Sequence, residues 1–120
     1  MVMSSSFPYV KGSMKNLDLD GDGVADTLTL QFTNYVDTGS ANITLKIYVD
    51  EEEYTDKAII KIGGRQPRAL TPEMYVESDY GDVVIINIAH KGSVKAGKHK
   101  VGFKVFVDWQ SFEASVEDIV

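Results

Sequence analysis

The stretch at residues 42–49 reads NITLKIYV. Its odd-numbered residues, from Ile43 to Val49, are all apolar, and its even-numbered residues are asparagine, threonine, lysine and tyrosine. This alternation predicts a β-strand with one face against a core and the other toward solvent. Residues 27–35 repeat the pattern, with Leu28, Leu30 and Phe32 on one face. Two neighbouring strands of this kind indicate an antiparallel sheet with one wet face.

Working outward, the sequence predicts six further strands, separated by turn clusters rich in Gly, Asp, Ser and Pro. They are expected at residues 7–14, 57–62, 74–76, 83–89, 101–107 and 114–120. The first is an edge strand because Pro8 cannot donate to a ladder. The run VVIINIA at residues 83–89 is the most apolar, and we expect it to be central and covered on both faces.

This pattern predicts an all-β fold, an antiparallel two-sheet sandwich of immunoglobulin-like type with seven to eight strands. A jelly roll or small barrel is the alternative. No segment has the pattern and caps of an amphipathic helix. Residues 1–6 are expected to be a flexible N-terminal segment, and residues 7–120 a single β-sandwich domain.

Composition narrows the function classes. The chain has 120 residues, 43% of them hydrophobic, and no cysteine, which excludes disulfides and thiolate metal sites. Its net charge of −6 argues against a nucleic-acid partner. No apolar run is long enough to span a bilayer, so we expect no membrane insertion by this segment. If the protein is exported or anchored, its signal or membrane helix must precede Met1.

An acidic loop, DLDGDGVAD at residues 18–26, lies before the strand at residues 27–35. Ca²⁺ takes about six to eight oxygen ligands, and carboxylates at alternate positions of a tight loop supply them well. The predicted ligands are the side chains of Asp18, Asp20, Asp22 and Asp26 and the backbone carbonyl of Val24. The sixth position of the loop is a glycine, as the sharp turn of such loops requires.

The loop departs from an EF-hand at position twelve, where Thr29 replaces the bidentate glutamate and a strand follows instead of a helix. The missing ligand must come from Asp26, from water or from a distant acidic residue, such as one of the glutamates at 51–53. The alternative interpretation is a solvated Asp/Gly turn. The spacing favours a structural calcium site over a sensor.

Other candidate sites carry less information. His90 and His99 flank a basic, glycine-containing loop at residues 91–98, which is either a solvated hairpin tip or an anion site. No catalytic triad or nucleotide-binding motif occurs, so we expect a non-enzymatic protein. Tyr48, Tyr75 and Trp109 are candidates for exposed aromatic contacts.

The loop at residues 18–26 resembles the D-x-D-G-D-G-x-x-D calcium loops of extracellular β-proteins, such as integrin-type propeller and thrombospondin repeats. Residues 94–108 are similar to the penultimate hairpin of adhesion-type immunoglobulin-like domains. The whole chain is similar in style to archaeal surface-appendage proteins, both archaellum stator domains and filament subunits. These resemblances imply an extracellular, cell-surface or periplasmic location and a role in envelope binding or self-assembly.

Together, these observations predict a calcium-stabilised β-sandwich that mediates protein–protein contact or assembly of a surface structure. The alternative function is a carbohydrate-binding or adhesion module that accompanies an enzyme. The tyrosines and Trp109 would then form a row on one sheet face.

Overall fold

The computed structural model describes residues 9–18, 21, 23, 26–34, 39–71, 73–90, 95–107 and 110–120. Strands dominate this part of the chain, and the only helix within it is a single 3-10 turn. The elements are β1 Lys15–Leu17, β2 Thr27–Thr33, β3 Gly39–Val49, β4 Glu52–Glu53, η1 Thr55–Lys57, β5 Ala58–Ile62, β6 Arg68–Ala69, β7 Met74–Ser78, β8 Val83–Ala89, β9 Lys98–Val107 and β10 Gln110–Ile119.

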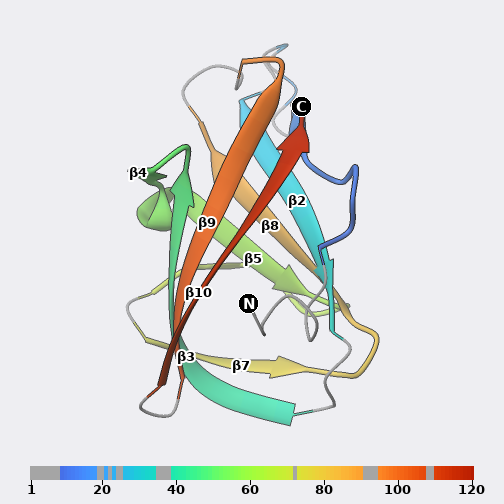
Figure 1. Ribbon diagram of the computed structural model, residues 1–120. Helices are drawn as coiled ribbons and strands as arrows, with labels where there is room; N and C mark the ends of the chain where they lie inside the picture. The colour runs from blue at the N-terminus through green and yellow to red at the C-terminus, as the bar shows by residue number, and fades with distance from the viewer. Residues whose placement is uncertain are drawn as a thin grey trace.

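The strands form two sheets that pack face to face (Figure 1). The first sheet has the order β1-β2-β8-β5-β6, and the second has the order β10-β9-β3-β4, with β7 also paired to β3. All of these pairings are antiparallel. The orders β1-β2-β8-β5 and β10-β9-β3 correspond to the ABED and GFC sheets of a constant-type immunoglobulin domain. The predicted immunoglobulin-like sandwich is therefore confirmed.

β2 and β3, the two alternating strands from which the fold class was predicted, lie in opposite sheets. β2 pairs with β8 in the first sheet, with Leu28 opposite Ile88, and β3 pairs with β9 in the second, with Ile47 opposite Phe103. Because directly opposite residues share a face, the apolar positions of paired strands gather on the same side. Each sheet thus presents an apolar face to the other.

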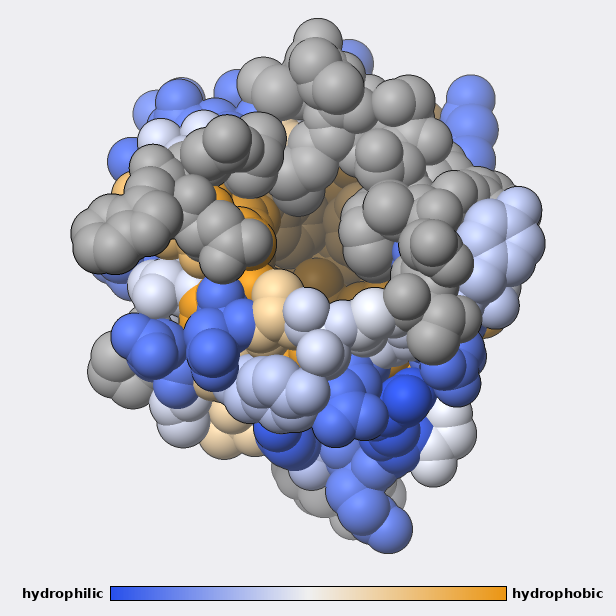
Figure 2. All heavy atoms as spheres, turned by 90° about the horizontal axis from the view of Figure 1, so that it is seen from below, coloured by the Kyte–Doolittle hydropathy of each residue, from blue (hydrophilic) through white to orange (hydrophobic). Residues whose placement is uncertain are grey.

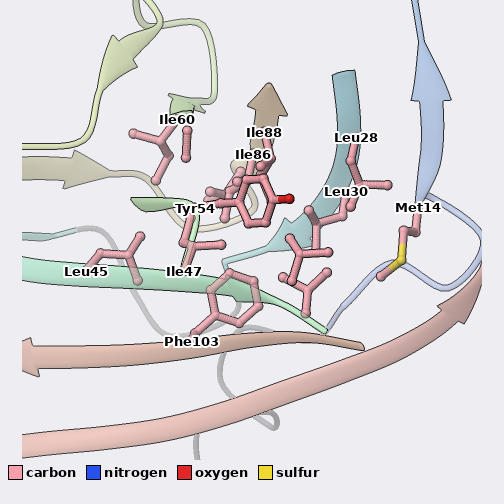
Figure 3. Close-up of a cluster of buried hydrophobic side chains, with 14 of the residues drawn as sticks. Met14, Leu28, Leu30, Leu45, Ile47, Tyr54, Ile60, Ile86, Ile88 and Phe103 are labelled. Carbon is pink, nitrogen blue, oxygen red and sulfur yellow. The ribbon is translucent and has the colours of Figure 1, made fainter. Parts of the chain in front are cut away.

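The core lies between these two faces (Figure 3). Leu28, Leu30, Ile47, Ile88 and Val101 are fully buried, and their burial contributes about 1.5–3 kcal/mol for each large side chain. The remaining buried apolar residues come from both sheets and their connections: Met14, Leu45, Val49, Tyr54, Ala58, Ile60, Ile62, Met74, Val84, Ile86 and Phe103. Seen from below, apolar surface also shows at the floor of a hollow (Figure 2).

The structure corrects several of the strand predictions, and among them the last strand, β10, begins at Gln110 and not at residue 114. Within the described part of residues 7–14, only Tyr9 forms a β-bridge, to Phe32, and the first strand begins later, at Lys15. β9 begins at Lys98, inside the predicted loop, because residues 98–100 pair with the end of β10. β8 is central, but one of its faces is partly open, with Val83 39% exposed.

Candidate functional site

The acidic loop connects β1 to β2 at one end of the first sheet. β1 and β2 are antiparallel neighbours with Leu17 opposite Thr27, so the loop at residues 18–26 closes a hairpin. The structure describes Asp18 and Asp26, at the two ends of this loop. The other predicted calcium ligands, Asp20, Asp22 and Val24, lie outside the described residues.

The carboxylate of Asp18 holds the turn of the loop. Its Oδ1 accepts the backbone N–H of Gly21 at 2.9 Å, and its Oδ2 accepts that of Gly23 at 2.8 Å. Gly21 has φ 75° and Gly23 has φ 87°, in the left-handed region that favours glycine. Gly23, the glycine at the sixth position of the loop, therefore has the left-handed conformation of a sharp turn.

Asp26 anchors the other end of the loop to β8. Its carbonyl oxygen accepts the N–H of His90 at 2.8 Å, directly after β8 ends. The His90 ring stacks on Tyr54, with centroids 5.3 Å apart and planes 15° apart. Tyr54 lies within a second acidic cluster, formed by Asp50, Glu51, Glu52, Glu53 and Asp56, so His90 lies between the start of β2 and this acidic segment after β3. Among the described residues, however, no three His, Cys, Asp or Glu side chains group closely enough to hold a metal.

The second acidic cluster contains an ion pair that the sequence did not predict. His99 contacts Asp50 Oδ2 through Nδ1 and the carbonyl of Lys95 through Nε2, each at 2.5 Å. Asp50 Oδ1 accepts the N–H of Lys100 at 3.0 Å. Both ring nitrogens of His99 face acceptors, so only the doubly protonated imidazolium donates to both.

These contacts shift the pKa of both partners. The hydrogen bond to Asp50 raises the pKa of His99, while burial opposes that shift only in part. Burial raises the pKa of Asp50, but the Lys100 N–H and the His99 ring outweigh it and hold that pKa below its usual value. The two histidines that flank the loop at residues 91–98 therefore make separate contacts. His99 pairs with Asp50, and His90 stacks on Tyr54.

A second network fastens residues 9–14 to β10. The Tyr9 hydroxyl donates to Asp118 Oδ2 at 2.7 Å, and the Gly12 N–H donates to the same oxygen at 2.7 Å. The Tyr9 hydroxyl also accepts the N–H of Met14 at 3.0 Å, while its ring contacts Phe32 edge-on at 5.6 Å. Tyr9 thus joins β2 of the first sheet to β10 of the second.

The candidate aromatic residues do not form one contiguous row in the described part of the chain. Tyr75 lies opposite Asn42 on β3, so it shares the solvent face of the second sheet with Tyr48, six residues further along that strand. Six residues of strand span about 20 Å. Lys104 lies over the Tyr48 ring, with its Nζ 5.3 Å from the centroid. Trp109 lies outside the described residues.

A cleft of about 220 Å³ lies on the opposite side of the sandwich from Tyr9, between the edges of the two sheets. β5, β6 and the loop between them line one wall, and β7 lines the other. The lining residues are Ile60, Ile62, Arg65, Gln66, Arg68, Tyr75 and Glu77. Sequence reasoning missed this site, although one signal was present: the chain has only two arginines, and they lie three residues apart, Arg65 in the loop after β5 and Arg68 at the start of β6.

One of these arginines shapes the loop. Arg65 Nη1 donates to Asp82 Oδ2 at 3.0 Å, and its Nη2 lies 3.7 Å from Asp79. Gly63 takes φ 56° beside them, and a Cβ there would lie 2.7 Å from the Asp82 carboxyl carbon. This close approach requires glycine, and it holds the loop against the turn before β8.

Comparisons with known proteins show no family for this chain. No protein-family model matches the chain, and no curated protein is significantly similar to it in sequence. Among solved structures, it is similar to part of a family 123 glycoside hydrolase from Clostridium perfringens, with 14% identity and a TM-score of 0.45. That match covers 81% of this chain but only 21% of the hydrolase, so the chain spans about a fifth of that protein.

A second similar structure is the GAE domain of GGA2p from Saccharomyces cerevisiae. The identity is 13% and the TM-score 0.36, over 95% of this chain and 96% of the domain. In the described part of the chain, no helix has the length and apolar character needed to cross a membrane.

Proposed function

We propose that this protein is a non-enzymatic, calcium-stabilised β-sandwich that works at the cell surface or in the periplasm through contact with other proteins. The observation that carries the calcium part is the D-x-D-G-D-G-x-x-D loop with its first carboxylate inside the turn. Asp18 receives the N–H groups of Gly21 and Gly23, and both glycines have positive φ. A glycine in a sharp turn at the sixth position is a feature of calcium loops with this spacing, which supports the proposal.

In this proposal, the side chains of Asp18, Asp20, Asp22 and Asp26 and the carbonyl of Val24 bind one Ca²⁺ ion. Four carboxylates in one short loop repel one another, and a divalent cation removes most of that repulsion. The ion would fix the hairpin between β1 and β2, whose other end is tied to β8 through the Asp26 carbonyl. Extracellular calcium modules of this kind have dissociation constants of about 10⁻⁴–10⁻³ M, which suits a structural site.

Calorimetry on chelator-stripped protein tests the calcium site. We expect one Ca²⁺ site, and we expect the pair of substitutions Asp20→Asn and Asp22→Asn to abolish it while leaving the fold intact. Asp56→Asn is the matched control, because it removes one carboxylate from the second acidic cluster and not from the loop. No binding heat for the unsubstituted protein, together with an unchanged melting temperature in excess calcium, would overturn the proposal.

The location and the contact role rest on the sequence resemblances to extracellular calcium loops and to archaeal surface-appendage proteins. Sedimentation of the chain with and without calcium tests the contact role for self-assembly. We expect the ion to promote association, because it orders one end of the first sheet. Identical sedimentation under both conditions, in protein shown by calorimetry to bind calcium, would contradict self-assembly.

The alternative function, a carbohydrate-binding or adhesion module, is favoured by the solvent face of the second sheet. Tyr75 and Phe106 are 50% and 44% exposed, and they lie on that face opposite neighbouring residues of β3, Asn42 and Thr44. Exposed aromatic rings on a flat sheet suit stacking against sugar rings. Retention on polysaccharide gels that Tyr75→Ala removes would favour this alternative over protein contact.

A further inference from the structure

The cleft between β5 and β7 has the features of a peptide-binding site. Its floor is apolar, because Ile60 and Ile62 point inward from β5 and belong to the core. Its volume of about 220 Å³ is below the range of about 300–1,000 Å³ that is usual for small-molecule sites. A space of this size suits one apolar side chain of a longer chain.

The edge of β7 can align such a chain. β7 pairs with β3 on one side, and no strand of the described residues pairs with it on the other. An unpaired strand edge presents backbone N–H and C=O groups to an extended peptide, and a pocket beside it selects the side chain. Tyr75 and Glu77 of β7 both line the cleft, so this edge and the pocket are adjacent.

Arg68 supplies the charge. Its Nη2 donates to the Tyr75 carbonyl at 2.6 Å, so the guanidinium lies beside the backbone of β7, and both residues line the cleft. Within the described part of the chain, no carboxylate lies within ion-pair distance of Arg68, whereas Arg65 is already paired with Asp79 and Asp82. The guanidinium of Arg68 therefore has further N–H donors with which it can bind a planar carboxylate. Glu77 lies two residues beyond Tyr75 and repels a carboxylate from that end.

We propose that this cleft binds an extended segment of a partner protein in which an acidic residue precedes or follows an aliphatic one. The aliphatic side chain enters the space above Ile60 and Ile62, its backbone pairs with β7, and the carboxylate binds Arg68. This inference rests on the protein-contact part of the proposed function and is independent of the calcium loop.

The test is a titration of isotope-labelled protein, followed by backbone amide NMR, with the peptide Ac-Ser-Thr-Glu-Leu-Thr-Ser-NH₂. We expect shifts concentrated in residues 60–77 and binding at least about tenfold tighter than for the same peptide with Gln in place of Glu, since charge-assisted hydrogen bonds are the strong ones. Equal binding of the two peptides would overturn the proposal. So would equally tight binding of 4-methylpentanoate, because pairing with β7 would then contribute nothing.

Protein variants locate the carboxylate contact. Arg68→Gln should weaken the Glu peptide to the level of the Gln peptide, and Glu77→Gln should leave its binding unchanged or strengthen it. Lys46→Gln is the matched control, because it also removes one exposed positive charge but lies on β3 outside the cleft. An Arg68→Gln protein that keeps its fold and binds the Glu peptide as before would refute the assignment.

Calcium calorimetry on the same sample separates the two proposals. If the protein binds calcium but does not bind the peptide, this inference alone is overturned. Protein that binds the peptide without a calcium site overturns only the calcium part of the proposed function.

Discussion

The ion pair of His99 and Asp50 makes the stability of the sandwich depend on pH in a defined direction. The pKa of His99 is raised in the folded state, so its contribution is complete below the ordinary value of 6.5 and is lost as the pH rises through the folded-state pKa. The pKa of Asp50 is lowered, so its contribution is complete above the ordinary value of 3.8 and is lost as the pH falls through the folded-state pKa. The pair therefore stabilises the fold most between those two ordinary values.

The structure also bounds the size of the effect. Hydrogen bonds to charged groups contribute about 1.5–3 kcal/mol when they are shielded from solvent. The His99 side chain is only 13% exposed, but the Asp50 side chain is 49% exposed, so water screens the pair toward the value of a surface ion pair. We expect a coupling free energy of about 1 kcal/mol, which is about fivefold in the unfolding equilibrium.

A double-mutant cycle measures this coupling directly. The free energy of unfolding in urea is compared for the unsubstituted protein, His99→Gln, Asp50→Asn and the double variant, at about pH 5.5 and about pH 9. We expect a coupling of about 1 kcal/mol at the lower pH and close to zero at the higher pH, where the imidazole is neutral. The pair of Lys98 and Glu117, which contains no histidine, is the matched control. Equal coupling at both pH values would refute the reasoning.

Three further predictions concern the core, a turn and residues 9–14. Ile47→Ala should lower the free energy of unfolding by about 2–5 kcal/mol, because Ile47 is fully buried. Ile59→Ala, at a site 44% exposed, should lower it far less, and urea unfolding of both variants measures the difference. Gly63→Ala should lower the melting temperature, because φ 56° and the 2.7 Å approach of a carboxyl carbon both oppose a Cβ there. Tyr9→Phe should speed amide exchange in residues 9–14, because the hydroxyl that Asp118 and the Met14 N–H share is lost. In the unsubstituted protein this protection should fade as the pH falls through the lowered pKa of Asp118, since hydrogen bonds from Tyr9 and the backbone stabilise its ionised form.

The sequence predicted the elements whose evidence is local. Alternation along residues 42–49 placed Leu45, Ile47 and Val49 on one face, and all three are buried. The start of β9 could not be predicted in this way, because Lys98 and Lys100 are polar and become strand only through pairing with β10. Local pattern describes a strand's own side chains and not the partner that extends it.

The same difference between local pattern and long-range pairing decides which features of the site could be predicted. The sharp turn at the sixth position of the acidic loop follows from the spacing of the loop itself, and Gly23 has φ 87° there. The contact of His99 with Asp50 joins residues 49 positions apart, and Arg68 meets β7 through a backbone carbonyl. No periodicity encodes such contacts, so they appear only once the two sheets are assembled.

The two long sides of the sandwich differ in a way that bears on where a partner binds. On one side, Tyr9 bridges β2 and β10 through its ring contact with Phe32 and its hydrogen bond to Asp118, which closes the gap between the sheets. On the other side, β5 and β7 stay apart, and the cleft remains between them. A sandwich that is sealed on one side and open on the other offers an extended peptide one edge to join. A calcium ion at the loop between β1 and β2 would stiffen the sealed side and leave the open side accessible.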